Sequence, residues 1–481
     1  MGPDNLRVPE NLHFGGGAED TALYPIVAVC LLLAIVLVLV LPRNKAIAPF
    51  LFAFFIIPIQ QVVVLGGLHF TALRFLILAG LVKRVVARKA PSDRFCGVDW
   101  AVVLFSISAA VCFCLEYRET GAIVRQAGNL LDTLGGYLVL RFLVPDGEAM
   151  RRTFKTLAAV SLVLGICMAY EQVGHRNVFG YVGYLSVEVV VRNGRVRSGG
   201  TLGCLHAGAF AGALIPVFFW LWKEGKHRLS AYAGLIGATT MVITSNSSTS
   251  VLAFAASIAS LAFWPLRSQM RLVRWAFVSV LLGLQLVMKA PVWALIQRIN
   301  LTGASSGFQR FMLVDMTIRH FSDWWLVGTK EYVTWGWESW DLCNQFVSVA
   351  LTGGLLSLIF YILIFQRCFS AIGKARKLVV GKPDQELLMW CLGSALFATV
   401  IAHFGINYMA QLIMAFFALV ACIVVATFEV RQTAPENALA PAHTPFASRL
   451  GVPRPSSPFG KTQNEVGHSV SGGKRSHPAK A

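Results

Sequence analysis

The sequence predicts an all-α fold, a polytopic transmembrane helical bundle with about 12–13 spans of about 20 apolar residues each. Of the 481 residues, 56% are hydrophobic and only 14% are charged, whereas an ordinary soluble domain carries about 25% charged residues. Long apolar runs follow one another along most of the chain, and Lys and Arg gather in the connections between them. These observations exclude a soluble globular enzyme.

Thirteen segments have the length and apolar composition needed to cross about 30 Å of hydrocarbon. They are 23–41, 47–66, 70–87, 98–115, 121–144, 153–173, 201–222, 230–245, 249–265, 274–290, 344–365, 386–404 and 409–428. The longest connection, residues 291–343, lies between the tenth and eleventh spans, where we expect a larger loop on the outer side of the membrane.

Basic residues occupy every second connection, as expected when cationic loops stay on the cytoplasmic side. They are Arg43 and Lys45; Lys83, Arg84, Arg88 and Lys89; Arg151, Arg152 and Lys155; Lys223, Lys226 and Arg228; Arg267, Arg271 and Arg274; and Arg367, Lys374, Arg376 and Lys377. This alternation predicts an outer N-terminus and, because the number of spans is odd, a cytoplasmic C-terminus.

The two ends of the chain differ from the membrane domain, residues 23–428. Residues 1–22 are polar, and no basic segment precedes the first apolar run, so we expect no cleavable signal peptide. Residues 429–481 are rich in Pro, Ser, Gly and Lys, a composition typical of a disordered, basic cytoplasmic tail.

The formal net charge of +18 resides in these orienting loops and in the tail, so it does not indicate nucleic-acid binding. The ten cysteines are scattered, mostly inside apolar runs, without the spacing of a zinc site or a disulfide framework. We therefore expect no metal and no cofactor.

We expect the chemistry in two outer loops, residues 174–200 and 291–343, and in the polar turn 244–250. The first loop ends with Arg197 and then a glycine-rich segment that runs into a span. Glycines allow close backbone approach, a helix N-terminus favours an anion, and a guanidinium binds phosphate through paired hydrogen bonds. Helix packing by the glycines and contact of Arg197 with lipid head groups explain the same pattern equally well.

The second loop has an apolar spacing over residues 307–321 that is typical of an amphipathic helix at the membrane surface. Asp315 and Arg319 are four residues apart and can pair on such a helix, which gives Arg319 a structural explanation. Arg310 is about half a turn out of phase with Arg319. It therefore faces away from that carboxylate and is the better candidate for ligand binding.

The start of the eleventh span carries a polar stripe, because Asp341, Gln345, Ser348 and Thr352 share one face of a helix. Polar groups within a span are costly unless they are partnered or face water. A functional lining and a structural hydrogen-bond network are equally compatible with this stripe. His403, near the outer end of the twelfth span, could join it, although a lone histidine there is more often packed than catalytic.

The order of these features resembles the family of O-antigen ligases and polysaccharide polymerases. Arg197-x-x-Gly200-Thr201-Leu at the start of a span is similar to the motif that opens the family's core. The turn 244–250 is similar to its outer Ser/Thr turn. Arg310, followed by Trp-Leu-Val-Gly328, resembles its segment of an arginine, a helix and a glycine turn.

The resemblance continues with Asn344 and the pair Gly353 and Gly354, which are similar to the family's His-Asn and glycine signature. One departure is that Cys343 stands where the family pattern has histidine. A histidine base therefore cannot be carried over to this position. The departure favours a polymerase or a divergent exopolysaccharide member over a lipid A core ligase.

The resemblance implies a metal-independent glycosyltransferase in the bacterial inner membrane, with its N-terminus in the periplasm and its C-terminus in the cytoplasm. The donor would be a glycan on undecaprenyl diphosphate and the acceptor a second glycan, joined on the periplasmic face during O-antigen or exopolysaccharide synthesis. Implied partners besides these substrates are the lipid bilayer and other polysaccharide assembly proteins.

Departure of a lipid diphosphate develops negative charge, which fixed guanidinium groups stabilise. We therefore expect Arg197 and Arg310 to hold the diphosphate, with Gly200 and Thr201 beside them. An acceptor hydroxyl also needs a base within hydrogen-bond reach. Asp341 is the first candidate for this base. The full predicted catalytic set is Asp341, Asn344, Glu338 and His320.

Two other functions remain open. A transporter or flippase of lipid-linked oligosaccharide would show repeated halves, broken spans and ionisable groups near the midplane, and this sequence shows no such repeat. A scaffold within a polysaccharide export assembly would use the tail as its contact.

Overall fold

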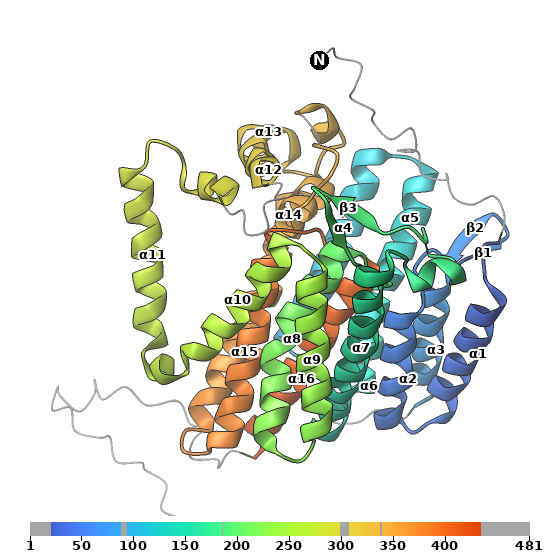
Figure 1. Ribbon diagram of the computed structural model, residues 1–481. Helices are drawn as coiled ribbons and strands as arrows, with labels where there is room; N and C mark the ends of the chain where they lie inside the picture. The colour runs from blue at the N-terminus through green and yellow to red at the C-terminus, as the bar shows by residue number, and fades with distance from the viewer. Residues whose placement is uncertain (1–20, 88–93, 185, 299–306, 337–338, 434–481) are drawn as a thin grey trace, which may run out of the picture. The chain divides into compact units, whose positions relative to one another are not determined.

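A computed structural model describes residues 21–87, 94–184, 186–298, 307–336 and 339–433. Most of these residues are helical, and the strands among them form two short hairpins, so the all-α class is confirmed for them (Figure 1). Residues 1–20 and 434–481 lie outside the described part of the chain, and the expectations for a polar N-terminal segment and a disordered tail stay predictions.

The helices and strands are, in chain order, α1 (Pro25–Val40), α2 (Arg43–Ile56), β1 (Val62–Leu65), β2 (Leu68–Thr71), α3 (Ala72–Val86), α4 (Gly97–Tyr117), α5 (Thr120–Leu130), η3 (Leu131–Gly135), α6 (Gly136–Leu143), α7 (Gly147–Gly174), η4 (Val178–Val182), β3 (Val190–Arg192), β4 (Arg195–Arg197), α8 (Cys204–Glu224), α9 (Arg228–Thr244), α10 (Ser248–Ala262), η5 (Trp264–Gln269), α11 (Met270–Val287), η6 (Val292–Arg298), α12 (Gly307–Arg319), α13 (Phe321–Trp324), η7 (Glu331–Thr334), α14 (Gln345–Leu378), α15 (Pro383–His403) and α16 (Ala410–Gln432).

Within the described residues, seven helices are long and apolar enough to cross a membrane. They are Gly97–Tyr117, Gly147–Gly174, Cys204–Glu224, Trp264–Val287, Gln345–Leu378, Pro383–His403 and Gln411–Gln432. Each of the thirteen predicted segments contains a helix. The chain is thus a polytopic helical membrane protein, while the count of 12–13 spans stays a prediction.

The predicted span 47–66 is wrong in its second half. Helix α2 ends at Ile56, and β1 pairs with β2 in an antiparallel hairpin. Gly66 and Gly67 form the turn with φ values of 58° and 79°, the positive angles that a tight two-residue hairpin turn requires. The preceding run of three valines favours an extended chain, because β-branched side chains fit a pleated strand.

The basic connections meet at one end of the bundle. Lys83 donates to the Leu39 carbonyl at the end of α1, and Arg152 at the start of α7 donates to the Asn44 carbonyl at the start of α2. Arg151 pairs with a glutamate at the end of α8. These contacts agree with the alternation of the basic clusters. We call the opposite end, where α12 lies, the α12 end.

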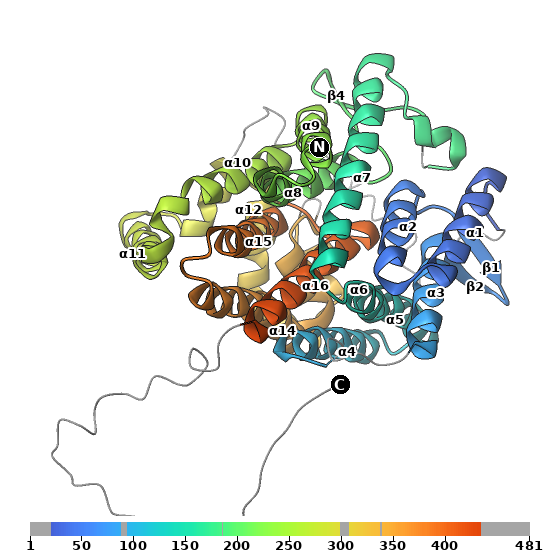
Figure 2. The ribbon, with the colours of Figure 1, turned by 90° about the horizontal axis from the view of Figure 1, so that it is seen from below.

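Helix α16 forms the centre of the bundle and packs against α6, α7, α14 and α15 (Figure 2). Its side chains between Phe416 and Ala426 are all buried. Helix α11 differs, because none of its side chains is buried and it stands apart from the other helices in Figure 1.

Helix α14 is interrupted near the α12 end. Gly354 has a φ of 71° and a ψ of −178°, which no helical residue adopts. The freed backbone groups bond to the connection that follows α13: Thr329 N–H donates to the Leu351 carbonyl at 2.8 Å, and Leu355 N–H donates to the Trp325 carbonyl at 2.9 Å. Backbone exchange of this kind satisfies a helix break inside a bundle.

Candidate functional site at the α12 end

A hairpin made of β3 and β4 carries Arg197. Asn193 and Gly194 turn the chain with φ values of 51° and 70°, a combination that suits a tight hairpin. The hairpin is tied to the turn between α9 and α10, because Asn246 Nδ2 donates to the Val196 carbonyl at 2.6 Å. Arg197 Nε is buried, and the described residues offer it no hydrogen-bond partner.

Arg310 lies in the first turn of α12 and is only 8% exposed. Its Nε donates to the Gly405 carbonyl at 3.1 Å, and its Nη2 donates to Thr249 Oγ1 at 3.2 Å. Thr249 belongs to the polar turn 244–250 that the sequence singled out. Both acceptors are neutral, and among the described residues Arg310 makes no ion pair.

The pKa of the Arg310 guanidinium is lowered, first because burial penalises the charged form and then because Arg197 and Arg192 repel it. Cys343 and Asp341 act in the opposite direction. The two predicted diphosphate-binding arginines therefore lie within electrostatic range of each other and of Asp341, although they come from two connections that are far apart in the sequence.

Asp341 is exposed and precedes α14, so the predicted helical stripe does not include it. Asn344 caps that helix instead: its Oδ1 accepts hydrogen bonds from the N–H groups of Phe346 and Val347 at 3.0 and 3.2 Å. The predicted catalytic asparagine thus has a structural explanation. Cys343, which replaces the histidine of the family pattern, is buried and lies near Arg310.

The Gly200 N–H and the Thr201 hydroxyl bond to acceptors within the protein. The Gly199 and Gly200 N–H groups donate to the two carboxylate oxygens of Glu171 at 2.7 and 2.9 Å. Thr201 is buried, and its hydroxyl donates to the Phe55 carbonyl at 2.6 Å. These groups shape the segment before α8. The sequence could not show this, because the partner carboxylate comes from α7.

Glu338 lies outside the described residues, so its predicted role is not tested. His320 sits on the surface, where its Nδ1 is 2.9 Å from Asp323 Oδ2 and its ring stacks on Trp335. The predicted pair of Asp315 and Arg319 is confirmed at 2.7 Å. It leaves Arg310 on a different face of α12, as the helical phase predicted.

The residues of the predicted polar lining form hydrogen bonds within the protein. Gln345 Oε1 accepts from the Tyr408 N–H at 2.6 Å, and Thr352 donates to the Ser348 carbonyl at 2.7 Å. His403 is fully buried, with its Nε2 2.7 Å from the Tyr361 hydroxyl. The packed reading of this histidine is therefore the right one.

One residue of the first-loop motif was overlooked in the sequence. His206 lies in the first turn of α8, and its Nε2 is 2.9 Å from the Asn407 carbonyl. The charge of Asp341 acts on His206 as it does on Arg310. The available signal was its position nine residues after Arg197 in the same motif, of which the sequence analysis uses only Arg197, the glycines and Thr201.

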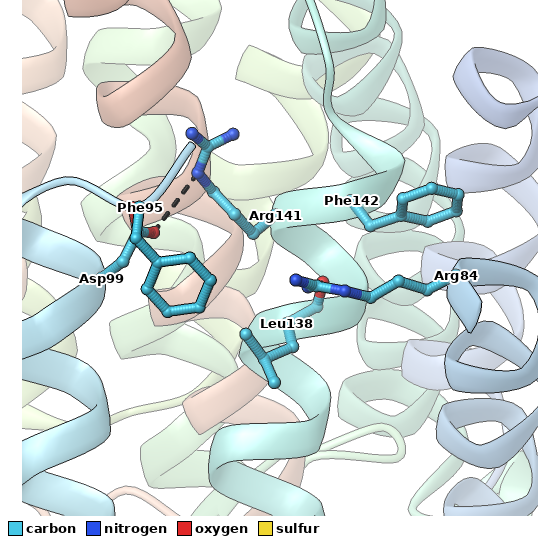
Figure 3. A pocket seen from close by; sticks show the side chains of 6 residues that line it. All are labelled: Arg84, Phe95, Asp99, Leu138, Arg141 and Phe142. Atoms are coloured by element: carbon cyan, nitrogen blue, oxygen red, sulfur yellow. Dashed lines mark hydrogen bonds and ion pairs between the residues drawn. The ribbon is translucent and has the colours of Figure 1, made fainter. Parts of the chain in front are cut away.

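A second cluster of charge lies at the opposite end of the bundle. A small pocket there is lined by Arg84, Phe95, Asp99, Leu138, Arg141 and Phe142 (Figure 3). Arg141 Nε is 3.3 Å from Asp99 Oδ1, and Arg84 donates to the Leu138 carbonyl at 2.7 Å. A carboxylate thus balances the buried charge at this end.

Among the described residues, no group of three or more His, Cys, Asp or Glu side chains could hold a metal ion. No protein-family model matches this chain, and no curated protein matches its sequence. The site at the α12 end is therefore interpreted from its own geometry and from the motifs of the sequence.

Proposed function

We propose that the α12 end binds the diphosphate of a lipid-linked glycan and transfers the glycan to a second glycan on the periplasmic face of a bacterial inner membrane. The donor lipid is undecaprenyl diphosphate, and the product belongs to O-antigen or exopolysaccharide synthesis. The enzyme is accordingly a metal-independent glycosyltransferase, either a polymerase or a ligase.

The observation that carries this proposal is that Arg197 and Arg310 lie within electrostatic range of each other, with no carboxylate bonded to either guanidinium among the described residues. Like charges repel, and a buried positive charge without a counter-charge is costly. An anionic ligand between the two side chains would remove both penalties. The N-terminus of α8 adds N–H groups at the same end, which favours an anion further.

In the proposed reaction, an acceptor hydroxyl oxygen attacks the anomeric carbon of the donor sugar. The bond between that carbon and the diphosphate oxygen breaks, and the diphosphate keeps the electron pair. The two guanidinium groups stabilise this developing charge, an effect worth about 3–4 kcal/mol for one fixed donor. The proton of the acceptor hydroxyl passes to a base in the site.

The arginines are tested in cells whose own copy of the gene is replaced by Arg197→Ala or Arg310→Ala. We expect both variants to abolish surface glycan while the protein level in the membrane stays normal. Arg319→Ala is the matched control, because this arginine of α12 is exposed and pairs with Asp315. Glycan retained in either test variant would exclude the proposal.

The sidedness is tested by single cysteines at positions 193, 305 and 339 and one in the tail, in a background without the native cysteines. Labelling of the first three from outside intact cells, with an unlabelled tail, is the expected outcome. Cytoplasmic labelling of these three positions would exclude periplasmic transfer.

A flippase for lipid-linked oligosaccharide is the second candidate, and the break in α14 at Gly354 is the observation that favours it, since transporters use broken spans. In such proteins the break lies near the bilayer midplane. Here it follows the start of α14 at Gln345 by fewer than three helical turns, which places it near one end of the helix. The transferase is therefore our first proposal.

A further inference from the structure

We propose that His206 is the general base of this site, accepting the proton of the acceptor hydroxyl at Nδ1. This inference rests on the proposed glycan transfer and assigns a catalytic residue that the motif comparison did not supply. The family pattern has its histidine where this chain has the buried Cys343. The structure places another histidine at the same end of the bundle.

The hydrogen bond at Nε2 fixes the tautomer of His206. A backbone carbonyl can only accept, so Nε2, at 2.9 Å from the Asn407 oxygen, must carry the proton. In the neutral ring, Nδ1 then holds the lone pair that a base needs. The described residues offer Nδ1 no hydrogen bond, and it is not among the buried unpartnered atoms.

The surroundings of Nδ1 suit an incoming hydroxyl. Gly203, the residue before α8, has a φ of 83°, and a side chain there would approach only two groups, the Tyr184 hydroxyl at 3.6 Å and His206 Nδ1 at 3.7 Å. The space beside Gly203 therefore opens between a hydroxyl and a free imidazole nitrogen. Burial raises the pKa of Tyr184 to about 12, so its hydroxyl stays protonated and can donate to the acceptor sugar.

The charge of Asp341 interacts electrostatically with both His206 and Arg310. The proposed base and the proposed diphosphate site therefore lie near the same carboxylate. Histidine serves as a general base more often than any other side chain, and its neutral ring offers a nitrogen lone pair for the proton. Imidazole therefore suits the role better. The Asp341 carboxylate stabilises the imidazolium that forms, and the imidazolium then releases its proton to water.

The test separates binding from chemistry in the full-length protein. Purified variants in lipid nanodiscs are titrated with undecaprenyl diphosphate, and surface glycan is measured in cells that carry the same variants. His206→Gln can keep a donor N–H toward the Asn407 carbonyl but provides no base. We expect unchanged binding of undecaprenyl diphosphate and a fall of at least about 100-fold in glycan output.

A second variant gives a positive readout. His206→Ala leaves room for a small base, so added imidazole should restore part of the glycan output, and it should not restore the output of Arg310→Ala. His227→Gln is the matched control, because His227 lies at the start of α9, at the opposite end of the bundle.

The outcomes distinguish the two proposals. Full output from His206→Gln, or no rescue of His206→Ala by imidazole, would overturn the base assignment and leave the arginine site intact. Loss of undecaprenyl diphosphate binding in His206→Gln would make His206 a binding residue and not a base. If Arg310→Ala binds undecaprenyl diphosphate as the unaltered protein does, glycan transfer at this site fails as a whole.

Discussion

Two buried arginines lie at opposite ends of the bundle and differ in what balances their charge. Arg141 is 6% exposed and forms an ion pair with Asp99. Arg310 is 8% exposed and bonds to a backbone carbonyl and a threonine hydroxyl, both of them neutral. The two side chains are thus almost equally buried, but only Arg141 has a bonded carboxylate that balances its charge.

This difference indicates which buried arginine stabilises the fold and which one can attract a ligand. A buried arginine beside a carboxylate is neutralised inside the protein and has little left to offer a ligand. A buried arginine that meets only neutral acceptors keeps its positive charge, and the half-buried Arg197 near it makes the same region more favourable for an anion. The Asp99–Arg141 pair therefore serves stability, and binding at the α12 end is what we propose.

The largest expected loss of stability follows Arg141→Met. This change leaves the Asp99 carboxylate buried without its partner, which costs about 3–5 kcal/mol. Adding Asp99→Asn should recover most of the loss, because the amide oxygen can still accept from the Cys96 N–H and the amide NH2 can donate to the Tyr137 hydroxyl oxygen, the two groups that now bond to Asp99. Thermal unfolding of purified protein in detergent measures both. Equal instability of the single and double variants would show that charge is not the cause.

Arg310→Met should invert this pattern. We expect glycan output to fall at least about 100-fold, while the free energy of unfolding falls by less than in Arg141→Met, because no carboxylate loses a partner. Arg310→Lys keeps the charge without the planar fork, so its output should lie between those of Met and the native arginine. A stability loss as large as that of Arg141→Met would remove the contrast between the two ends.

The two halves of α14 allow a further contrast. Gly354→Ala forces a side chain into a φ of 71° and to 2.6 Å from the Leu326 carbonyl oxygen, and we expect a loss of about 1–3 kcal/mol. Gly373→Ala, in the regular half, meets nothing within 4 Å and should stabilise by up to about 1 kcal/mol. The thermal unfolding midpoints of the two purified variants measure this difference. A Gly354→Ala variant as stable as the unaltered protein would contradict the helix break.

The smallest effect concerns the cap of α14. Asn344→Ala should cost about 1 kcal/mol, because two N–H groups of the first turn lose their acceptor. Asn344→Ser should keep the cap, since serine is also a favoured N-cap residue. We expect glycan output to follow the amount of folded protein in both variants. A stable Asn344→Ser protein without output would return Asn344 to the catalytic set.

Predictions from local residue spacing agree with the structure better than predictions from hydrophobicity alone. The period of α12 predicted both the Asp315–Arg319 pair and the different direction of Arg310, because neighbours four residues apart meet on any helix. Hydrophobicity alone misread residues 57–66, since an apolar run next to a proline and two glycines favours a hairpin over a helix.

The sequence by itself determined that this is a polytopic helical membrane protein, where most of its long helices lie, and which connections carry positive charge. Each of these follows from composition and from contacts between near neighbours. Only the tertiary structure decided that the Glu171 carboxylate accepts hydrogen bonds from the Gly199 and Gly200 N–H groups. It also decided that the Arg310 guanidinium donates to the Thr249 hydroxyl and the Gly405 carbonyl. Such partners come from distant helices, and a buried group's electrostatics depends on which partner packing brings to it.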